Sequence, residues 1–182
     1  MSAARDYQAK PKPFELLLAQ DRIARRINEL GQAITRDYAG RTPVFLGVLK
    51  GCVVFMADLM RAVKLPLEVE FISAESYHDG TAQQELKLDH WFTRSLRGRD
   101  VLIVEGVVDS GRTVEAISRE LAAVEPASVE VVTLIDKPAN HRRKLVIKYV
   151  GFALGNEFVI GFGLDNTQRY RNLPFIGRMI EE

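Results

Sequence analysis

The chain has 182 residues, of which 47% are hydrophobic and 27% are charged, a size that suits one well-buried α/β domain and is too short for two. Its 25 Lys and Arg residues balance 24 Asp and Glu residues, so no overall electrostatic field draws the protein to nucleic acid or to a membrane. Any anion-binding site must therefore be built locally.

The N-terminal residues 1–13 are polar and contain two prolines, without the apolar segment of a secretory signal. We expect a flexible arm over 1–13, a single domain over 14–182 and a cytoplasmic location. No stretch approaches the roughly 18 apolar residues that a membrane span needs. The sole cysteine, Cys52, has no partner in the chain for a disulfide or a thiolate metal site and is expected in the core.

Hydrophobic periodicity predicts the elements in chain order. Ile23, Ile27, Leu30 and Ile34 recur at spacings of four, three and four, which predicts an amphipathic helix within 14–38. A strand over 44–49, a helix over 52–63 and a strand over 67–77 follow, and 78–97 is expected to be a long loop. The remaining predictions are a strand over 100–105, a helix over 113–124, a strand over 128–135 and short strands over 149–152 and 158–163. This alternation predicts an α/β fold with a mostly parallel twisted sheet flanked by helices.

Residues 101–113, VLIVEGVVDSGRT, are the most informative segment of the chain. An apolar strand leads through Glu105 and Gly106 into an Asp-Ser-Gly turn and a predicted helix start. Backbone N–H groups in such a turn, together with a helix N-terminus, form a natural phosphate site at the carboxyl end of a strand. Taken alone, the segment could also be an ordinary strand-turn-helix junction in which Asp109 or Ser110 caps the helix.

This loop resembles the signature of the type I phosphoribosyltransferases, with one departure, because Gly106 replaces the second of two acidic residues. Four further segments extend the resemblance to the bacterial hypoxanthine-guanine phosphoribosyltransferases. They are 49–51 (LKG), 134–138 (LIDKP), 157–165 (EFVIGFGLD) and 168–177 (QRYRNLPFIG). They occur in the family's order and cover roughly residues 15–180. The resemblance implies a small hood formed by the terminal segments beside the sheet.

The resemblance also implies the reaction. A phosphoribosyl group passes from phosphoribosyl pyrophosphate to hypoxanthine or guanine and gives IMP or GMP plus pyrophosphate. Asp109 would be the catalytic base near purine N7, and the phosphate loop would hold the 5′-phosphate through Ser110, Gly111, Arg112 and Thr113. Lys137 would donate to the purine 6-oxo group, which adenine lacks.

The remaining site residues follow from the same resemblance. Phe158 would stack on the base and Val159 would offer backbone groups to its edge, although a lone strand aromatic is more often a core residue. Lys50, Gly51 and Arg171 would bind pyrophosphate, with the Leu49–Lys50 peptide in a non-proline cis form. Asp165 and Glu105 would serve a Mg²⁺ ion, and Glu105 would also contact the ribose.

A few alternatives stay open for these assignments. Without the family context, Lys50 is a solvated lysine and Asp165 is a turn residue. Ser76 and Tyr77 would begin a loop that closes over the reacting centre, or the loop is a surface excursion without catalytic duty. With Gly106 in place of a carboxylate, binding of the ribose or of the metal would be weaker. Alternatively, this position requires glycine because its backbone has a positive φ. The three histidines show no metal-ligand spacing.

Alternatives at the level of the whole protein are a phosphoribosyltransferase that prefers xanthine or another base, or a nucleotide-sensing regulator that binds RNA. A near-neutral charge balance gives the regulator little support. Trp91 and Phe92 in the long loop favour a subunit contact or a core edge, so we expect a homo-oligomer, either a dimer or a tetramer.

Overall fold

A computed structural model describes residues 14–76, 86–90 and 95–180. Its main sheet has six strands in the order β4-β3-β2-β5-β6-β7. The strands are β2 (Val44–Leu49), β3 (Glu68–Ser76), β4 (Leu86–His90), β5 (Asp100–Val108), β6 (Ser128–Asp136) and β7 (Tyr149–Ala153). All neighbours pair in parallel except β4, which runs antiparallel at the edge beside β3. The expected parallel, helix-flanked sheet is thus confirmed.

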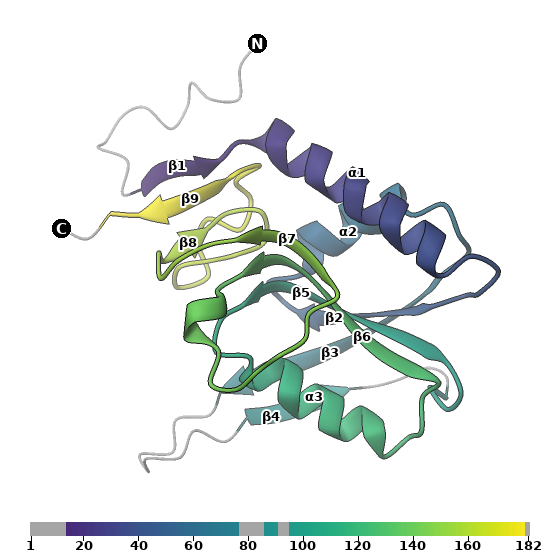
Figure 1. Ribbon diagram of the computed structural model, residues 1–182. Coiled ribbons are helices and arrows are strands. Elements are labelled where there is room, and N and C mark those ends of the chain that lie inside the picture. Colours follow the sequence, from purple (N-terminus) through teal and green to yellow (C-terminus); the bar gives the residue numbers. More distant parts are fainter. Residues whose placement is uncertain (1–13, 77–85, 91–94, 181–182) are drawn as a thin grey trace.

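Helices cover both faces of this sheet (Figure 1). Helices α1 (Gln20–Asp37) and α2 (Val53–Ala62) pack on one face, where their apolar residues join Phe45 and Leu102 in one core cluster. Helix α3 (Arg112–Ala122) packs on the other face against Leu46 and Ile103. Central strands buried on both sides read as near-continuous apolar runs, which is why the sequence marks them so clearly. Within the described ranges, no helix is long and apolar enough to cross a membrane.

A second, antiparallel sheet joins the two ends of the chain, in the order β1-β9-β8. It consists of β1 (Phe14–Leu18), β8 (Val159–Ile160) and β9 (Ile176–Met179), with Phe14 opposite Met179. Figure 1 shows it beside the main sheet, with the purple first strand next to the yellow last one. This small sheet is the hood that the resemblance implies.

Several predicted boundaries were wrong. The first residues of the predicted helix region, 14–18, form β1, because Glu15 and Leu16 are exposed on an edge strand of the small sheet and only α1 carries the helical period. Residues 86–90 of the expected loop form β4. The strand predicted over 158–163 is limited to Val159–Ile160, since Gly161, Phe162 and Gly163 all have positive φ. Strand β9 was not predicted.

Candidate active site

Three loops meet at the carboxyl ends of the neighbouring strands β2, β5 and β6. They are Lys50–Gly51 after β2, Asp109–Gly111 after β5 and Lys137–Asn140 after β6. The Leu49–Lys50 peptide bond before the first loop is cis, as the resemblance implies. In parallel sheets this edge is where ligands bind, so the fold brings the sequence-predicted residues of three distant segments together.

The loop after β5 has the geometry of an anion cradle. Gly111 adopts a left-handed conformation with φ 78°, which a residue with a side chain rarely adopts, and it caps α3 directly before Arg112. A surface hollow here is lined by Glu105 and by residues 107–114. The backbone N–H groups of the first turn of α3 and the positive end of its dipole favour a bound phosphate.

Asp109 projects from this loop and meets two donors from the segment after β6. Lys137 Nζ donates to Oδ2 at 3.0 Å, and Asn140 Nδ2 donates to Oδ1 at 2.8 Å. The Lys137 side chain is 8% exposed, whereas that of Asp109 is 51% exposed. Desolvation acts to raise the pKa of Asp109, but the hydrogen bonds from Asn140 and Lys137 outweigh it and hold the pKa below its ordinary value. The carboxylate is therefore ionised and faces solvent.

Glu105 lies deeper, four residues before Asp109 on β5. Its side chain is buried, and desolvation raises its pKa to about 8, against a smaller opposite effect of a backbone hydrogen bond from Gly106. Without a bound cation, this carboxyl group is mostly protonated at neutral pH.

A second cluster gathers around the loop after β8. Arg171 forms an ion pair with Asp165 at 2.7 Å and donates to the Gly163 carbonyl at 2.8 Å. The Asp165 and Arg171 side chains are each 26% exposed, so both remain accessible to a ligand. Asp165 also accepts a hydrogen bond from the backbone N–H of Gln168 at 2.8 Å.

The Gly51 carbonyl connects this cluster to β5. It lies 2.7 Å from the position that a Cβ atom would take on Gly106, and 2.5 Å from the corresponding position on Gly163. Gly106 does not have a positive φ. The structure therefore overturns the positive-φ explanation of Gly106, since what excludes a side chain there is the close approach of the loop after β2.

Phe158 and Val159 stand at the edge of the small sheet. Phe158 is 54% exposed, so the alternative of a core position was wrong. Val159 is buried and belongs to β8, which is the edge strand of its sheet in the order of the described strands. A flat aromatic face and one side of a strand backbone are thus available to a planar ligand.

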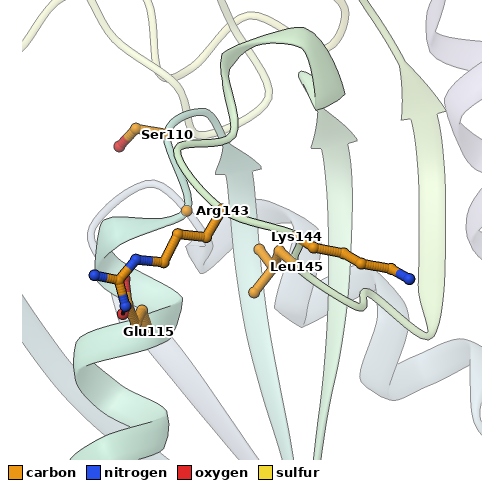
Figure 2. A pocket seen from close by; sticks show the side chains of 6 residues that line it. Ser110, Glu115, Arg143, Lys144 and Leu145 are labelled. Atoms are coloured by element: carbon orange, nitrogen blue, oxygen red, sulfur yellow. Dashed lines mark hydrogen bonds and ion pairs between the residues drawn. The ribbon is translucent and has the colours of Figure 1, made fainter.

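On the outer side of the phosphate loop, a second hollow is lined by Ser110, Gly111, Glu115 and residues 143–145. Figure 2 shows Arg143 reaching toward Glu115 on α3, to which it donates at 3.1 Å, while Lys144 points away. Both side chains of this ion pair are well exposed. Of the basic residues in this run, Arg143 thus pairs locally with the helix that follows the phosphate loop.

Comparisons with known proteins agree with this geometry. The model of the phosphoribosyl transferase domain matches residues 15–167. The chain is 41% identical over 164 residues to a hypoxanthine-guanine phosphoribosyltransferase of Lactococcus lactis, covering 90% of this chain and 89% of that protein. The chain belongs to the phosphoribosyltransferase family.

Solved structures and longer relatives extend this result. The crystal structure of a hypoxanthine phosphoribosyltransferase from Staphylococcus aureus superposes on this phosphoribosyltransferase with a TM-score of 0.86 at 38% identity, over 91% of each chain. A bifunctional protein TilS/HprT of Listeria monocytogenes is 43% identical over 164 residues, but the chain spans only 25% of that protein's length.

The predicted site residues fall into three groups. Glu105 and the phosphate-loop residues line one hollow, and Lys137 pairs with Asp109 there. Lys50 and Gly51 follow β2, where the Gly51 carbonyl approaches Gly163, whose own carbonyl accepts from the Arg171 side chain that pairs with Asp165. Phe158 and Val159 lie at the edge of the small sheet. Ser76 ends β3, whereas Tyr77, Trp91, Phe92 and the arm over 1–13 lie outside the described residues. Sequence reasoning missed Asn140, and it assigned no role to His141, which contacts Asp136 at 2.8 Å. The one signal in the sequence for Asn140 is that it is the next polar side chain after the Asp-Lys-Pro motif.

Proposed function

We propose that this chain transfers the phosphoribosyl group of phosphoribosyl pyrophosphate to hypoxanthine or guanine, a purine salvage reaction that yields IMP or GMP and pyrophosphate. The observation that carries the proposal is the pairing of Asp109, the first residue of the phosphate loop, with Lys137 after β6. A proton acceptor and a cationic donor at this spacing match two adjacent groups on one edge of a 6-oxopurine, namely the N7–H and the 6-oxo group.

The reaction joins purine N9 to the anomeric carbon while the bond from that carbon to pyrophosphate breaks. Asp109 receives the proton that leaves N7, and Lys137 donates to the 6-oxo oxygen. Because Lys137 is buried, a 6-amino group opposite its ammonium would leave both groups unpaired, and such a mismatch costs about 1–3 kcal/mol or more. The exposed ring of Phe158 stacks on the purine, and the edge of β8 at Val159 offers backbone groups to it.

The substrate's phosphates are held at two places. Backbone N–H groups of Ser110–Thr113 and the hydroxyls of Ser110 and Thr113 bind the 5′-phosphate at the start of α3. Lys50 and Arg171 neutralise the leaving pyrophosphate, and the Gly51 backbone contacts it. Arg suits this task because its planar guanidinium binds pairs of oxygens, whereas Lys provides a compact charge.

The residues fit a Mg²⁺ ion that is shared with substrate. No cluster of three or more His, Cys, Asp or Glu side chains suited to a metal occurs in the described part of the chain. Mg²⁺ however needs only one or two carboxylates when substrate phosphates and waters complete its shell. Asp165 provides an accessible carboxylate, and Glu105 would be a second oxygen ligand once ionised, beside the ribose hydroxyls. The ion would stabilise negative charge on the leaving pyrophosphate.

An assay of nucleotide formation tests the proposal. Purified protein is supplied with phosphoribosyl pyrophosphate, Mg²⁺ and one of hypoxanthine, guanine, xanthine or adenine, and the nucleotide is measured. We expect turnover with hypoxanthine and guanine and at most traces with adenine. Preferential turnover of xanthine would support the alternative base specificity, and RNA binding without nucleotide formation would support a regulator.

We also propose that residues 14–182 act as one domain, that the chain forms a homo-oligomer, and that it acts in the cytoplasm, where its charged substrate is retained. Val53 on α2 and Val69 and Phe71 on β3 are exposed although apolar, which favours a covered surface in an assembly. Sedimentation of the wild type and of a Phe71→Glu variant tests this, since the variant should shift toward the monomer.

A further inference from the structure

Asn140 ends the short 3-10 turn η1 (Pro138–Asn140) that follows β6, and its side-chain amide holds one oxygen of the proposed base. The amide donates to Asp109 Oδ1 at 2.8 Å, while the second oxygen, Oδ2, is in contact with Lys137. The two oxygens of Asp109 are therefore not equivalent. One is held by a neutral amide that has no other role in the proposed reaction, and the other faces the ammonium that would meet the substrate.

The turn itself is fixed from several sides. The backbone N–H of Lys137 donates to the Val108 carbonyl at 2.9 Å, and that of Arg142 donates to the Ser110 carbonyl at 3.2 Å. His141 contacts Asp136 at 2.8 Å, and both of these side chains are 11% exposed. Pro138 fixes φ at the start of the turn. These contacts tie the segment that carries Asn140 to the phosphate loop that carries Asp109.

Asp109 needs this fixed hydrogen bond from Asn140 when the purine binds. If Lys137 turns its ammonium toward the 6-oxo group, Asp109 loses one of its two donors. The terminal torsion of a carboxylate is soft, so an Asp side chain without a fixed partner can rotate either oxygen away from N7. A proton transfer needs the acceptor within hydrogen-bonding distance of its proton.

We propose that Asn140 is a positioning residue, which holds Oδ1 of Asp109 so that Oδ2 stays aligned with purine N7 when Lys137 turns to the 6-oxo group. This inference rests on the proposed function and specifies how its base is oriented. The charged or titratable groups that face Asp109 here are Lys137 and His141, which is itself paired with Asp136.

The first test is the Asn140→Ala variant, with Asn28→Ala on the exposed face of α1 as its control. We expect kcat for hypoxanthine to fall about tenfold in Asn140→Ala, as expected for a lost hydrogen bond to a charged group. The KM for phosphoribosyl pyrophosphate should stay unchanged, and the acid limb of the pH profile should move to higher pH because a donor to the carboxylate is lost. Asn28→Ala should match the wild type.

The second test is a double-mutant cycle with Asp109→Asn. If Asn140 acts through Asp109, Asn140→Ala should lower kcat in the wild-type background and have no further effect in the Asp109→Asn background. Equal losses in both backgrounds, or an unchanged kcat and pH profile in the single variant, overturn the inference. Absence of nucleotide formation by the wild type overturns the proposed function instead, so the two failures are distinguishable.

Discussion

At the scale of single residues, the site contains two carboxyl groups whose surroundings shift their pKa values in opposite directions. Asp109 is half exposed and accepts two hydrogen bonds, which favour its charged form. Glu105 is buried and favours its neutral form. Opposite environments of this kind let two similar groups take different roles. In the proposed reaction, Asp109 would serve as a base near neutral pH, and Glu105 would become charged when a cation or a substrate donor binds.

Replacing Asp109 by Asn keeps the shape of the side chain and its contact with Asn140 while it removes the proposed proton acceptor. We expect kcat to fall by about 10²–10⁴, with little change in the melting temperature because the side chain is half exposed. Steady-state kinetics with hypoxanthine, together with thermal denaturation, measure both. A nearly wild-type kcat would remove Asp109 from the role of base.

Replacing Lys137 by Met keeps the buried alkyl chain and removes the ammonium group. Turnover of hypoxanthine relative to adenine should decrease by about tenfold or more, since the proposed donor to the 6-oxo group is lost. The neighbouring Lys144 is exposed and points away from the loop (Figure 2), so Lys144→Met is the matched control. An unchanged ratio in Lys137→Met would show that Lys137 does not read the base.

Glu105 makes stability depend on pH in a defined direction. Its pKa rises from 4.5 to about 8 on folding, so between these values the folded state binds more protons than the unfolded state. The free energy of unfolding should therefore fall as pH rises from 5 to 8, by at most about 1.4 kcal/mol per pH unit. Denaturant titrations in the absence of Mg²⁺ should show this component in the wild type and in Glu29→Gln. If Glu105→Gln retains the same slope, Glu105 is not its source.

At the scale of secondary structure elements, the sequence was most informative where the pattern of apolar residues extends over many residues or runs without interruption. Strand β5 and helix α1 were predicted because burial on both faces, or on one helical stripe, leaves a pattern within the element itself. Strands β1, β8 and β9 are short, and β1 pairs with β9 across nearly the whole chain, so nothing in their own residues specifies the partner. Strand β4 is an antiparallel edge strand and carries only a weak pattern.

The same distinction, between patterns within one segment and contacts between distant segments, applies to the site. Motif residues such as Asp109 and Lys137 were identified by resemblance, and the parallel sheet explains why they meet. The contact between Asn140 and Asp109 could not be predicted, because it depends on how a three-residue turn is oriented above another strand. The crowding at Gly106 was also beyond the sequence, since it depends on the path of the loop after β2.

That crowding changes what a substitution at Gly106 should do. A side chain there must displace the Gly51 carbonyl, at 2.7 Å from the Cβ position, and overpacking of this kind costs about 1–3 kcal/mol. We expect both Gly106→Ala and Gly106→Asp to lower the melting temperature and to raise the KM for phosphoribosyl pyrophosphate. Gly106→Ala separates the steric effect from the added charge. Tighter substrate binding in Gly106→Asp with unchanged stability would instead support the account of a missing carboxylate.

At the scale of the whole molecule, one core joins the two sheets. Leu18, Val159 and Ile176 of the small sheet share a cluster with residues of α1, α2 and the main sheet. Arg26 of α1 also donates to the carbonyls of Val150 and Gly151 on β7, at 2.8 and 2.9 Å. Elements that share one core unfold together. We expect far-UV and near-UV circular dichroism to give coincident denaturant transitions, and two separate transitions would contradict a single domain.

The pairing of β1 with β9 also has a consequence for the order of folding. Phe14 lies opposite Met179, so this pairing closes a loop of nearly the full chain, and contacts between distant residues form slowly because the entropy of loop closure opposes them. The parallel pairs β2-β5 and β5-β6 span much shorter segments. We expect the phosphate loop to acquire its shape early and the small sheet beside Phe158 to form last. During refolding, protection of backbone amides in β5 should therefore precede protection in β9.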